Sequence, residues 1–371
     1  MTVGVNALYM IPGGVGGTEI YLRSLLTALA GIDRENRYLV FTNAETGADL
    51  IPRQDNFRQV RQRVRARVRP ARILWEQTFL PIAAARHGID VLFNPGFTSP
   101  VVCPCPTVTV FHDLQHKRHP EHFRWFELPF WRMLLFAAVR RSTKLIAVSE
   151  ATKSDLMRYY NVPSGHVRVI GHSADPKMFG LAKLDRAQPP YLLAVSTLHP
   201  HKNLDRLLRA FAEFRLLRPD FRLVVAGLRG FDTRHLESLR TSLGLDDAVR
   251  FTGWIPREEL YSLFAHARAF IYPSTFEGFG MPVIEALAAG LPTACSNIEP
   301  LATLAGDAAL LFDPNSVPPI RDGITRIASD DSLRRRLAAA GPLRAAAYTW
   351  ENAARFTLET LREASDLGAV C

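Results

Sequence analysis

The sequence has few cysteines and no long apolar run. Its four cysteines, in 371 residues, give neither a disulfide framework nor the usual Cys-x2-Cys zinc spacing, and they are Cys103, Cys105, Cys295 and Cys371. A reducing cytoplasm is therefore the expected location. No apolar stretch approaches the roughly 18–20 residues that span a bilayer. The first residues read as a strand and lack a basic segment, so we expect no secretory signal.

Repeats and low-complexity segments are also lacking, and the composition is that of a globular protein. Hydrophobic residues make up 47% and charged residues 22% of the chain. The length fits two domains of ordinary size better than one core. The formal net charge of +9 favours anionic partners, such as nucleotide sugars, anionic lipid surfaces or nucleic acid.

The most informative stretch is residues 276–285, with the sequence Phe-Glu-Gly-Phe-Gly-Met-Pro-Val-Ile-Glu. Its glycines disfavour a helix in the middle, whereas Pro282 suits the start of a helix that runs to about residue 289 and stops at Gly290. This pattern predicts Glu277 in a loop and Glu285 in the first turns of the helix.

The chemistry of this stretch suits a sugar that carries phosphate. The N–H groups at a helix start are unpaired and the helix dipole is positive there, which favours an anion. Gly278 and Gly280 allow the backbone to approach a ligand closely. A carboxylate accepts two hydrogen bonds, so each glutamate suits a vicinal diol, one on a transferred sugar and one on a ribose. The preceding strand, residues 269–273, delivers the loop to the carboxyl edge of a buried sheet.

The string Ser-Thr-Phe-Glu-Gly-Phe-Gly-Met-Pro at residues 274–282, with Glu285-Ala286 and Gly290-Leu291-Pro292 after it, resembles the E-x7-E signature of retaining glycosyltransferases of family 4. The resemblance implies the α/β architecture called GT-B, with two doubly wound, Rossmann-like domains that face a central cleft. We expect an acceptor domain at 1–180, a linker rich in charge and proline, a nucleotide-sugar domain at 190–348, and a helix at 349–371 that crosses back to the first domain.

A glycine-rich loop at residues 11–18 follows the first strand and precedes a helix at about 19–30. Such a loop can bind phosphate through its N–H groups. No Lys-Ser/Thr follows, so an ATPase P-loop is excluded. The family resemblance implies that Gly16, Gly17 and Thr18 close over the donor pyrophosphate. A glycine turn without a ligand is the alternative.

His112 and Asp113 end a predicted buried strand at 107–113. The family resemblance implies that His112 faces the transferred sugar and takes part in catalysis, whereas a loop histidine with a structural partner is the alternative. A neutral imidazole can bond a hydroxyl or share a proton. Asp113 and Ser149 are candidate acceptor-binding residues, and Ser149 is also a predicted helix N-cap.

The second domain opens with a strand at 191–195 and the string Ser-Thr-Leu-His-Pro-His-Lys-Asn at 196–203. It is similar to the family's Gly-Thr-Leu-Glu-Pro-Arg-Lys-Asn. The resemblance assigns Lys202 to the donor phosphates, whose charge grows on departure. His201 replaces the family arginine, which puts a second permanent cation in doubt. The donor-binding candidates in this domain are Ser196, Lys202, Gly253, Trp254, Glu277, Gly278, Phe279, Gly280, Met281 and Glu285; Trp254 either stacks on a base or fills the core.

Two stretches remain open to more than one interpretation. Residues 58–72 hold seven arginines, five of them at alternate positions from Arg61 to Arg69. A strand would place those five on one face, as a solvated surface or as a basic face near a lipid pyrophosphate or an anionic leaflet. The aromatic stretch at 123–141 is expected to be mostly core, with a membrane-facing edge as the alternative.

The resemblance predicts an enzyme in which Glu277 binds sugar hydroxyls, Glu285 binds the ribose, and His112 and Lys202 complete the catalytic set. It implies transfer of mannose from GDP-mannose to a glycan or lipid-linked acceptor in surface polysaccharide synthesis, by a cytoplasmic protein with possible peripheral membrane contact and without nucleic acid. UDP-glucose or another UDP-sugar is the alternative donor, and a non-catalytic sugar-nucleotide or glycan-binding protein is the alternative class. A phosphorylase would need a pyridoxal-phosphate lysine, for which no motif is found. No metal or other cofactor is expected, since no Asp-x-Asp motif lies near the site.

Overall fold

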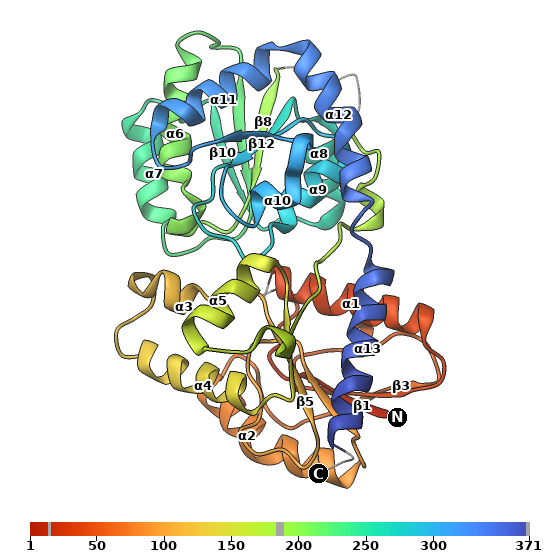
Figure 1. Ribbon diagram of the computed structural model, residues 1–371. Helices are drawn as coiled ribbons and strands as arrows, with labels where there is room; N and C mark the ends of the chain where they lie inside the picture. Colours follow the sequence, from red (N-terminus) through yellow and green to blue (C-terminus); the bar gives the residue numbers. More distant parts are fainter. Residues whose placement is uncertain (14–15, 183–188, 369–371) are drawn as a thin grey trace. The chain divides into compact units, whose positions relative to one another are not determined.

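In the computed structural model, the described residues are 1–13, 16–182 and 189–368, and the chain divides into two compact units. The first contains Met1–His172 and Thr349–Cys371, and the second contains Ser173–Tyr348. In each unit, helices flank a parallel sheet (Figure 1). Gly14 and Val15 of the glycine loop, residues 183–188 of the expected linker, and Cys371 lie outside the described residues.

The sheet of the first unit has the strand order β3-β2-β1-β4-β5-β6-β7, and all of its neighbouring strands are parallel. Its strands are β1 (Thr2–Ala7), β2 (Arg37–Thr42), β3 (Phe57–Arg61), β4 (Val91–Asn94), β5 (Thr107–Phe111), β6 (Lys144–Ala147) and β7 (Val167–Val169). Its helices are α1 (Gly17–Ile32), α2 (Arg69–Arg86), α3 (Gln115–Arg118), α4 (Leu128–Arg141), α5 (Glu150–Tyr160) and α13 (Trp350–Gly368). Helix α13 packs against α1, so the end of the chain belongs to the first unit.

The sheet of the second unit has the order β10-β9-β8-β11-β12-β13 and is also parallel. Its strands are β8 (Tyr191–Val195), β9 (Arg222–Ala226), β10 (Val249–Gly253), β11 (Ala269–Tyr272), β12 (Thr293–Ser296) and β13 (Leu310–Phe312). Its helices are α6 (Leu204–Arg215), α7 (Thr233–Ser242), α8 (Arg257–His266), α9 (Met281–Ala289), α10 (Leu301–Ala305), α11 (Val317–Ser329) and α12 (Asp331–Ala345).

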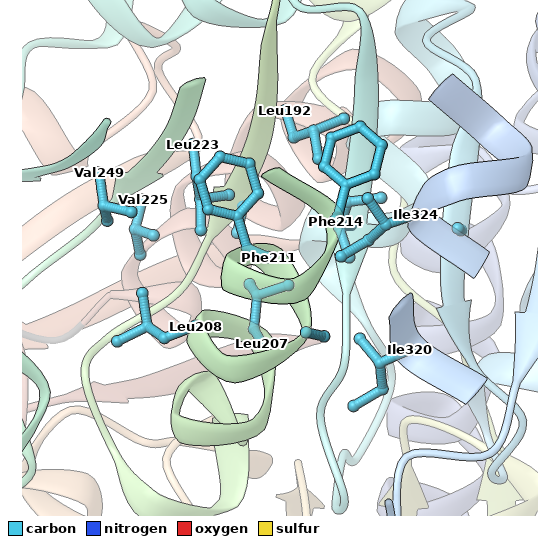
Figure 2. Packing of buried hydrophobic residues seen from close by; sticks show 14 of the residues in the cluster. Leu192, Leu207, Leu208, Phe211, Phe214, Leu223, Val225, Val249, Ile320 and Ile324 are labelled. Carbon is cyan, nitrogen blue, oxygen red and sulfur yellow. The ribbon is translucent and has the colours of Figure 1, made fainter. Parts of the chain in front are cut away.

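The core of the second unit explains why its strands read as short, continuous apolar runs. Phe211 and Phe214 of α6 and Ile324 of α11 meet the side chains of Leu192 and Leu223 on the sheet (Figure 2). Helices cover both faces of a parallel sheet, so both faces of each strand are buried. Among the described helices, none is long and apolar enough to cross a membrane.

The strand order reverses direction once in each unit, and this reversal determines where a site can form. In the first unit the chain moves outward from β1 to β3 and then returns to place β4 on the other side of β1. In the second unit the reversal falls between the neighbouring strands β8 and β11. At such a switch point the loops at the carboxyl ends of neighbouring strands diverge and leave room for a ligand.

Candidate active site

An ion pair lies at the switch point of the second unit. Lys202 follows β8, Glu277 follows β11, and the Lys202 Nζ lies 2.6 Å from the Glu277 Oε1. The Tyr272 hydroxyl, at the end of β11, donates to the same carboxylate at 2.7 Å and accepts from Lys202 at 3.1 Å. The two charged side chains are only 16% and 10% exposed, so the pair is largely shielded from water.

Hydrogen bonds hold the two loops that carry this pair together. The Asn203 side-chain amide donates to the carbonyls of Pro273 and Pro314, each at 2.9 Å. The His201 carbonyl accepts from the Ser274 hydroxyl at 3.0 Å and from the Thr275 amide at 2.8 Å. Asn203 has a left-handed backbone with a φ of 58°, a conformation that asparagine tolerates better than most residues. The position of Lys202 is therefore fixed by the backbone on both sides of it.

The loop after β11 leads into α9 as the sequence predicts, with Glu277 in the loop and Glu285 in the first turns of the helix. Gly280 caps the helix with a φ of 107°, and a Cβ atom there would lie 2.5 Å from a Leu301 methyl group. Only glycine satisfies both conditions. The helix ends at Gly290, where φ is 72°, which confirms the predicted stop.

Glu285 is buried and forms an ion pair with Arg257, with 2.6 Å between the Glu285 Oε1 and the Arg257 Nη2. Burial raises the pKa of the Glu285 carboxyl above its ordinary value, and the Arg257 charge acts in the opposite direction. Arg257 also reaches the Asp175 carboxylate at 3.4 Å, and the Tyr261 hydroxyl donates to that carboxylate at 2.5 Å. Burial by itself would raise the pKa of Asp175, but the hydrogen bonds and Arg257 lower it.

Sequence reasoning missed Arg257 and Tyr272, although both bond an acid of the E-x7-E stretch. Tyr272 is the last residue of β11, directly before the loop. Arg257 is the first residue of α8, shortly after the strand that ends in Gly253. In each case the available signal was the position: a polar residue at the carboxyl edge of a parallel strand.

The donor-binding candidates Gly253 and Trp254 lie at the end of β10. Gly253 is the last residue of β10 and has a φ of 70°. Trp254 is 63% exposed, so the interpretation as core is wrong. The Ser196 hydroxyl is buried and finds no hydrogen-bond partner in the described part of the chain. A Cβ on Gly227 would lie 2.1 Å from the Ser196 carbonyl, so glycine is needed where these two loops meet.

A row of four aromatic rings includes His199 and His201, which directly precede Lys202 in the sequence. The rings of His199 and Phe231 are 5.3 Å apart, and those of His199 and His201 are 5.9 Å apart. His201 in turn meets the edge of Phe276 at 6.4 Å. The ring of His201 thus extends a stacking surface, and its carbonyl supports the Glu277 loop.

The described glycines of the loop at residues 11–18, Gly13, Gly16 and Gly17, are exposed. Helix α1 begins at Gly17, earlier than the predicted residue 19, and Gly16 has a φ of 58°. A Cβ at either glycine would meet no atom within 4 Å. Glu19 accepts from the Gly13 amide at 2.9 Å and pairs with Arg23 at 2.9 Å. The backbone at Gly13 is therefore hydrogen-bonded to the first turn of α1. Thr18 is the second residue of that helix.

His112 directly follows β5 and is half-buried in the first unit. Its Nε2 lies 2.8 Å from the Pro95 carbonyl, which can only accept, so Nε2 carries the hydrogen and Nδ1 is the acceptor. The Nδ1 lies 3.4 Å from the His172 Nε2. Burial lowers the pKa of His112 to about 4. The imidazole is thus neutral at physiological pH and has the structural partner that the alternative required.

The other acceptor candidates of the first unit also have local partners. Asp113 accepts from the Gln115 amide at 2.9 Å. Ser149 caps α5 by accepting from the Thr152 amide at 3.1 Å, which confirms the predicted N-cap. Their roles toward an acceptor remain predictions.

One group of side chains in the described residues has metal-ligand geometry. His119, Glu121 and His122 place one possible ligand atom each within 4.8 Å of one another. They lie on the short turn after α3 in the first unit, and His119 already bonds Glu121 at 2.9 Å. None of the three belongs to the E-x7-E stretch or the Lys202 loop.

Comparison with known proteins decides the family. The first half matches the model described as Glycosyltransferase Family 4 (residues 15–178), and the second half matches Glycosyl transferases group 1 (residues 182–344). The chain is 31% identical over 265 residues to O-antigen chain mannosyltransferase B of Escherichia coli, an alignment that covers 69% of this chain and 70% of that protein. The chain belongs to the family 4 glycosyltransferases.

Two further similarities place this glycosyltransferase among its relatives. It is 27% identical over 273 residues to the serotype-specific mannosyltransferase WbdA of Escherichia coli, an alignment that covers 69% of this chain but only 33% of that protein. Its fold is similar to that of sucrose-phosphate synthase from Thermosynechococcus elongatus, with a TM-score of 0.80, 21% identity and 98% of both chains covered. The two Rossmann-like units are therefore those of the GT-B architecture, as predicted.

Proposed function

We propose that this glycosyltransferase transfers mannose from GDP-mannose to a glycan or lipid-linked saccharide during bacterial surface polysaccharide synthesis, with retention of configuration. The Lys202–Glu277 ion pair carries the proposal, because it places one cation and one hydrogen-bond acceptor at the switch point. The mannosyl part is supported by the names of the two Escherichia coli relatives. The retaining part rests on the E-x7-E signature.

In the proposed reaction each partner of the ion pair turns to a different part of the donor. Lys202 and the N–H groups that open α9 bind the diphosphate, while Glu277 accepts hydrogen bonds from the sugar hydroxyls. Glu285 accepts from the ribose. The acceptor hydroxyl forms a bond to the anomeric carbon as the bond to the diphosphate breaks, and the departing phosphate takes the hydroxyl proton. The interaction of Lys202 with the phosphate becomes stronger as negative charge develops there in the transition state, so it lowers the barrier.

We propose further that Gly16, Gly17 and Thr18 bind the donor and that neutral His112 accepts a hydrogen bond from a sugar hydroxyl at Nδ1. Both roles rest on the family motifs. Transfer then needs no metal ion, because Lys202 and the start of α9 offset the diphosphate charge. The check is a rate that stays unchanged in EDTA; a rate restored only by a divalent cation contradicts this part.

The test uses the purified full chain, a panel of nucleotide sugars and a synthetic α-mannoside with an undecyl aglycone as acceptor. We expect release of GDP from GDP-mannose that rises on adding the acceptor, together with an α-linked product. Faster turnover of UDP-glucose or another UDP-sugar would replace the donor assignment. Tight donor binding with no release under any condition would instead favour a sugar-nucleotide-binding protein.

A further inference from the structure

Helix α4 of the first unit is apolar on two sides, but the described protein covers only one of them. Leu135, Ala138 and Val139 pack against the core beside β5 and β6. The opposite side presents Met133, which is 62% exposed, and Phe136, which is 49% exposed. The expectation that this stretch is mostly core is therefore wrong, because apolar periodicity does not show how many sides of a helix are covered.

The turn before α4 adds two larger rings to the exposed side. Trp125 is 84% exposed and Phe126 is 57% exposed, and Phe130 in the first turn of the helix is 43% exposed. We call Trp125, Phe126, Phe130, Met133 and Phe136 the aromatic face. Single exposed apolar residues are ordinary on protein surfaces, but five within one turn and one helix mark an interaction site.

Arginines are interspersed with the aromatic face. Arg132, Arg140 and Arg141 are exposed, and none of them forms an ion pair with a carboxylate in the described residues. Arg124 has only a distant partner, Glu127 at 3.8 Å. The surface therefore combines apolar area with uncompensated positive charge.

The arginine-rich run of residues 58–72 carries further exposed positive charge in the first unit. Arg63, Arg65 and Arg67 are exposed while Val64 and Ala66 between them are buried, so the charges lie on one side as the alternation predicts. The Arg69 guanidinium lies 5.8 Å from the centre of the Trp131 ring, which joins the start of α2 to α4. Both helices are visible in the first unit in Figure 1.

We propose that the aromatic face of α4, with Arg124, Arg132 and Arg140, docks on an anionic lipid leaflet. Aromatic rings and methionine insert at the boundary between headgroups and acyl chains, and arginines bind lipid phosphates from the same side. A second copy of this chain would bring the same positive surface against itself, which disfavours a symmetric dimer. The proposal rests on the proposed function for its purpose, since a lipid-linked acceptor lies in a leaflet.

Co-sedimentation of the full chain with vesicles tests the proposal. One vesicle preparation contains phosphatidylcholine alone and the other contains phosphatidylcholine with phosphatidylglycerol. We expect binding to the anionic vesicles that weakens as salt is raised. Trp125→Ser with Met133→Ser should lower the partition coefficient at least about tenfold, because both side chains insert. The matched control, Leu217→Ser with Leu343→Ser, removes side chains that are 71% and 78% exposed in the second unit and should leave binding unchanged.

Three outcomes would overturn the proposal: no sedimentation with anionic vesicles, equal binding to both preparations, or equal loss in the aromatic and control variants. Capture of an acidic protein by this face, without vesicle binding, would also overturn it.

Activity on a short, water-soluble mannoside separates this inference from the proposed function. The Trp125→Ser, Met133→Ser variant should keep that activity and lose vesicle binding. A wild-type chain that binds vesicles but turns over no nucleotide sugar would refute the proposed function and leave the lipid-docking inference standing.

Discussion

The two units offer different chemistry at the carboxyl edges of their sheets. In the second unit the candidate site consists of charges that are already paired, Lys202 with Glu277 and Arg257 with Glu285. In the first unit it consists of the exposed Gly16 and Gly17 and of His112, whose pKa burial lowers to about 4. We therefore expect the second unit to bind and neutralise a charged donor and the first unit to contribute neutral hydrogen bonds.

The largest effect should come from breaking the Lys202–Glu277 pair. Lys202→Ala removes the cation that we propose faces the departing phosphate, and we expect transfer to fall by about 10²–10³-fold or more. Glu277→Ala should have an effect of similar size. The measurement is kcat/KM with the preferred donor, and near-native circular dichroism establishes that the fold survives. Arg335→Ala, an exposed residue of the second unit, is the charge control. Full activity in both active-site variants would remove these residues from the mechanism.

The next effect concerns the Arg257–Glu285 pair. Arg257→Ala leaves a buried carboxylate without its cation, and we expect a loss of about 2–3 kcal/mol in the free energy of unfolding, because Arg257 is itself partly exposed. Urea denaturation measures it. Adding Glu285→Gln to Arg257→Ala should recover part of the loss, since the uncompensated charge is gone. A double variant whose losses simply add would show that the two residues are not coupled.

A pair of glycine variants sharpens the comparison between the two loops. Gly280→Ala forces a side chain into a backbone with a φ of 107° and toward Leu301, and we expect a loss of stability of about 2 kcal/mol. Gly17→Ala meets open space and should change stability by less than about 0.5 kcal/mol. Thermal unfolding of both variants provides the test. Equal destabilisation would mean that the loop of the first unit is as tightly packed as that of the second.

The smallest effect of a single side chain is a pH dependence that arises in the first unit. Burial lowers the pKa of His116 to about 4, and its Nε2 lies 2.6 Å from the Tyr160 hydroxyl. The unfolded chain binds this proton near pH 6.5 and the folded chain does not, so stability is lost as pH falls from about 6.5 toward 4, by about 1 kcal/mol per pH unit. His112 and His172 act in the same direction. Urea midpoints at pH 7.5 and 5.5 measure the slope.

His116→Gln should reduce that slope without abolishing it, because His112 and His172 remain, whereas His87→Gln, at an exposed position of the same unit, should leave it unchanged. Stability that rises on acidification in the wild-type chain would contradict the assignment of neutral, buried imidazoles.

Local signals account for the parts of the structure that the sequence predicts well. Gly280, Pro282 and Gly290 constrain the backbone by themselves, so the loop that carries Glu277 and the helix that carries Glu285 follow from residues 276–290 alone. The parallel strands follow from short apolar runs between helical patterns.

What the sequence leaves open depends on contacts between distant segments. Arg257 reaches Glu285 and Asp175 only because α8, α9 and the segment at 173–182 pack together. Trp254 and Trp125 were each compatible with core or surface, and only the arrangement of neighbouring elements shows that both are exposed. The neutral state of His112 likewise depends on burial by segments that lie far from it in the chain, among them the one that carries His172.

The shared hydrogen bonds of Lys202, Tyr272 and Glu277 also bear on product release. In the proposed reaction an intact donor satisfies both charges, the lysine through its diphosphate and the glutamate through its hexose. Of these two residues, the spent nucleotide would engage only Lys202, and Glu277, which is 10% exposed, would be left with the Tyr272 hydroxyl. Closure of the original ion pair then competes directly with the retained nucleotide. We therefore expect weak inhibition by the nucleoside diphosphate, and stronger inhibition once Glu277 is replaced by glutamine.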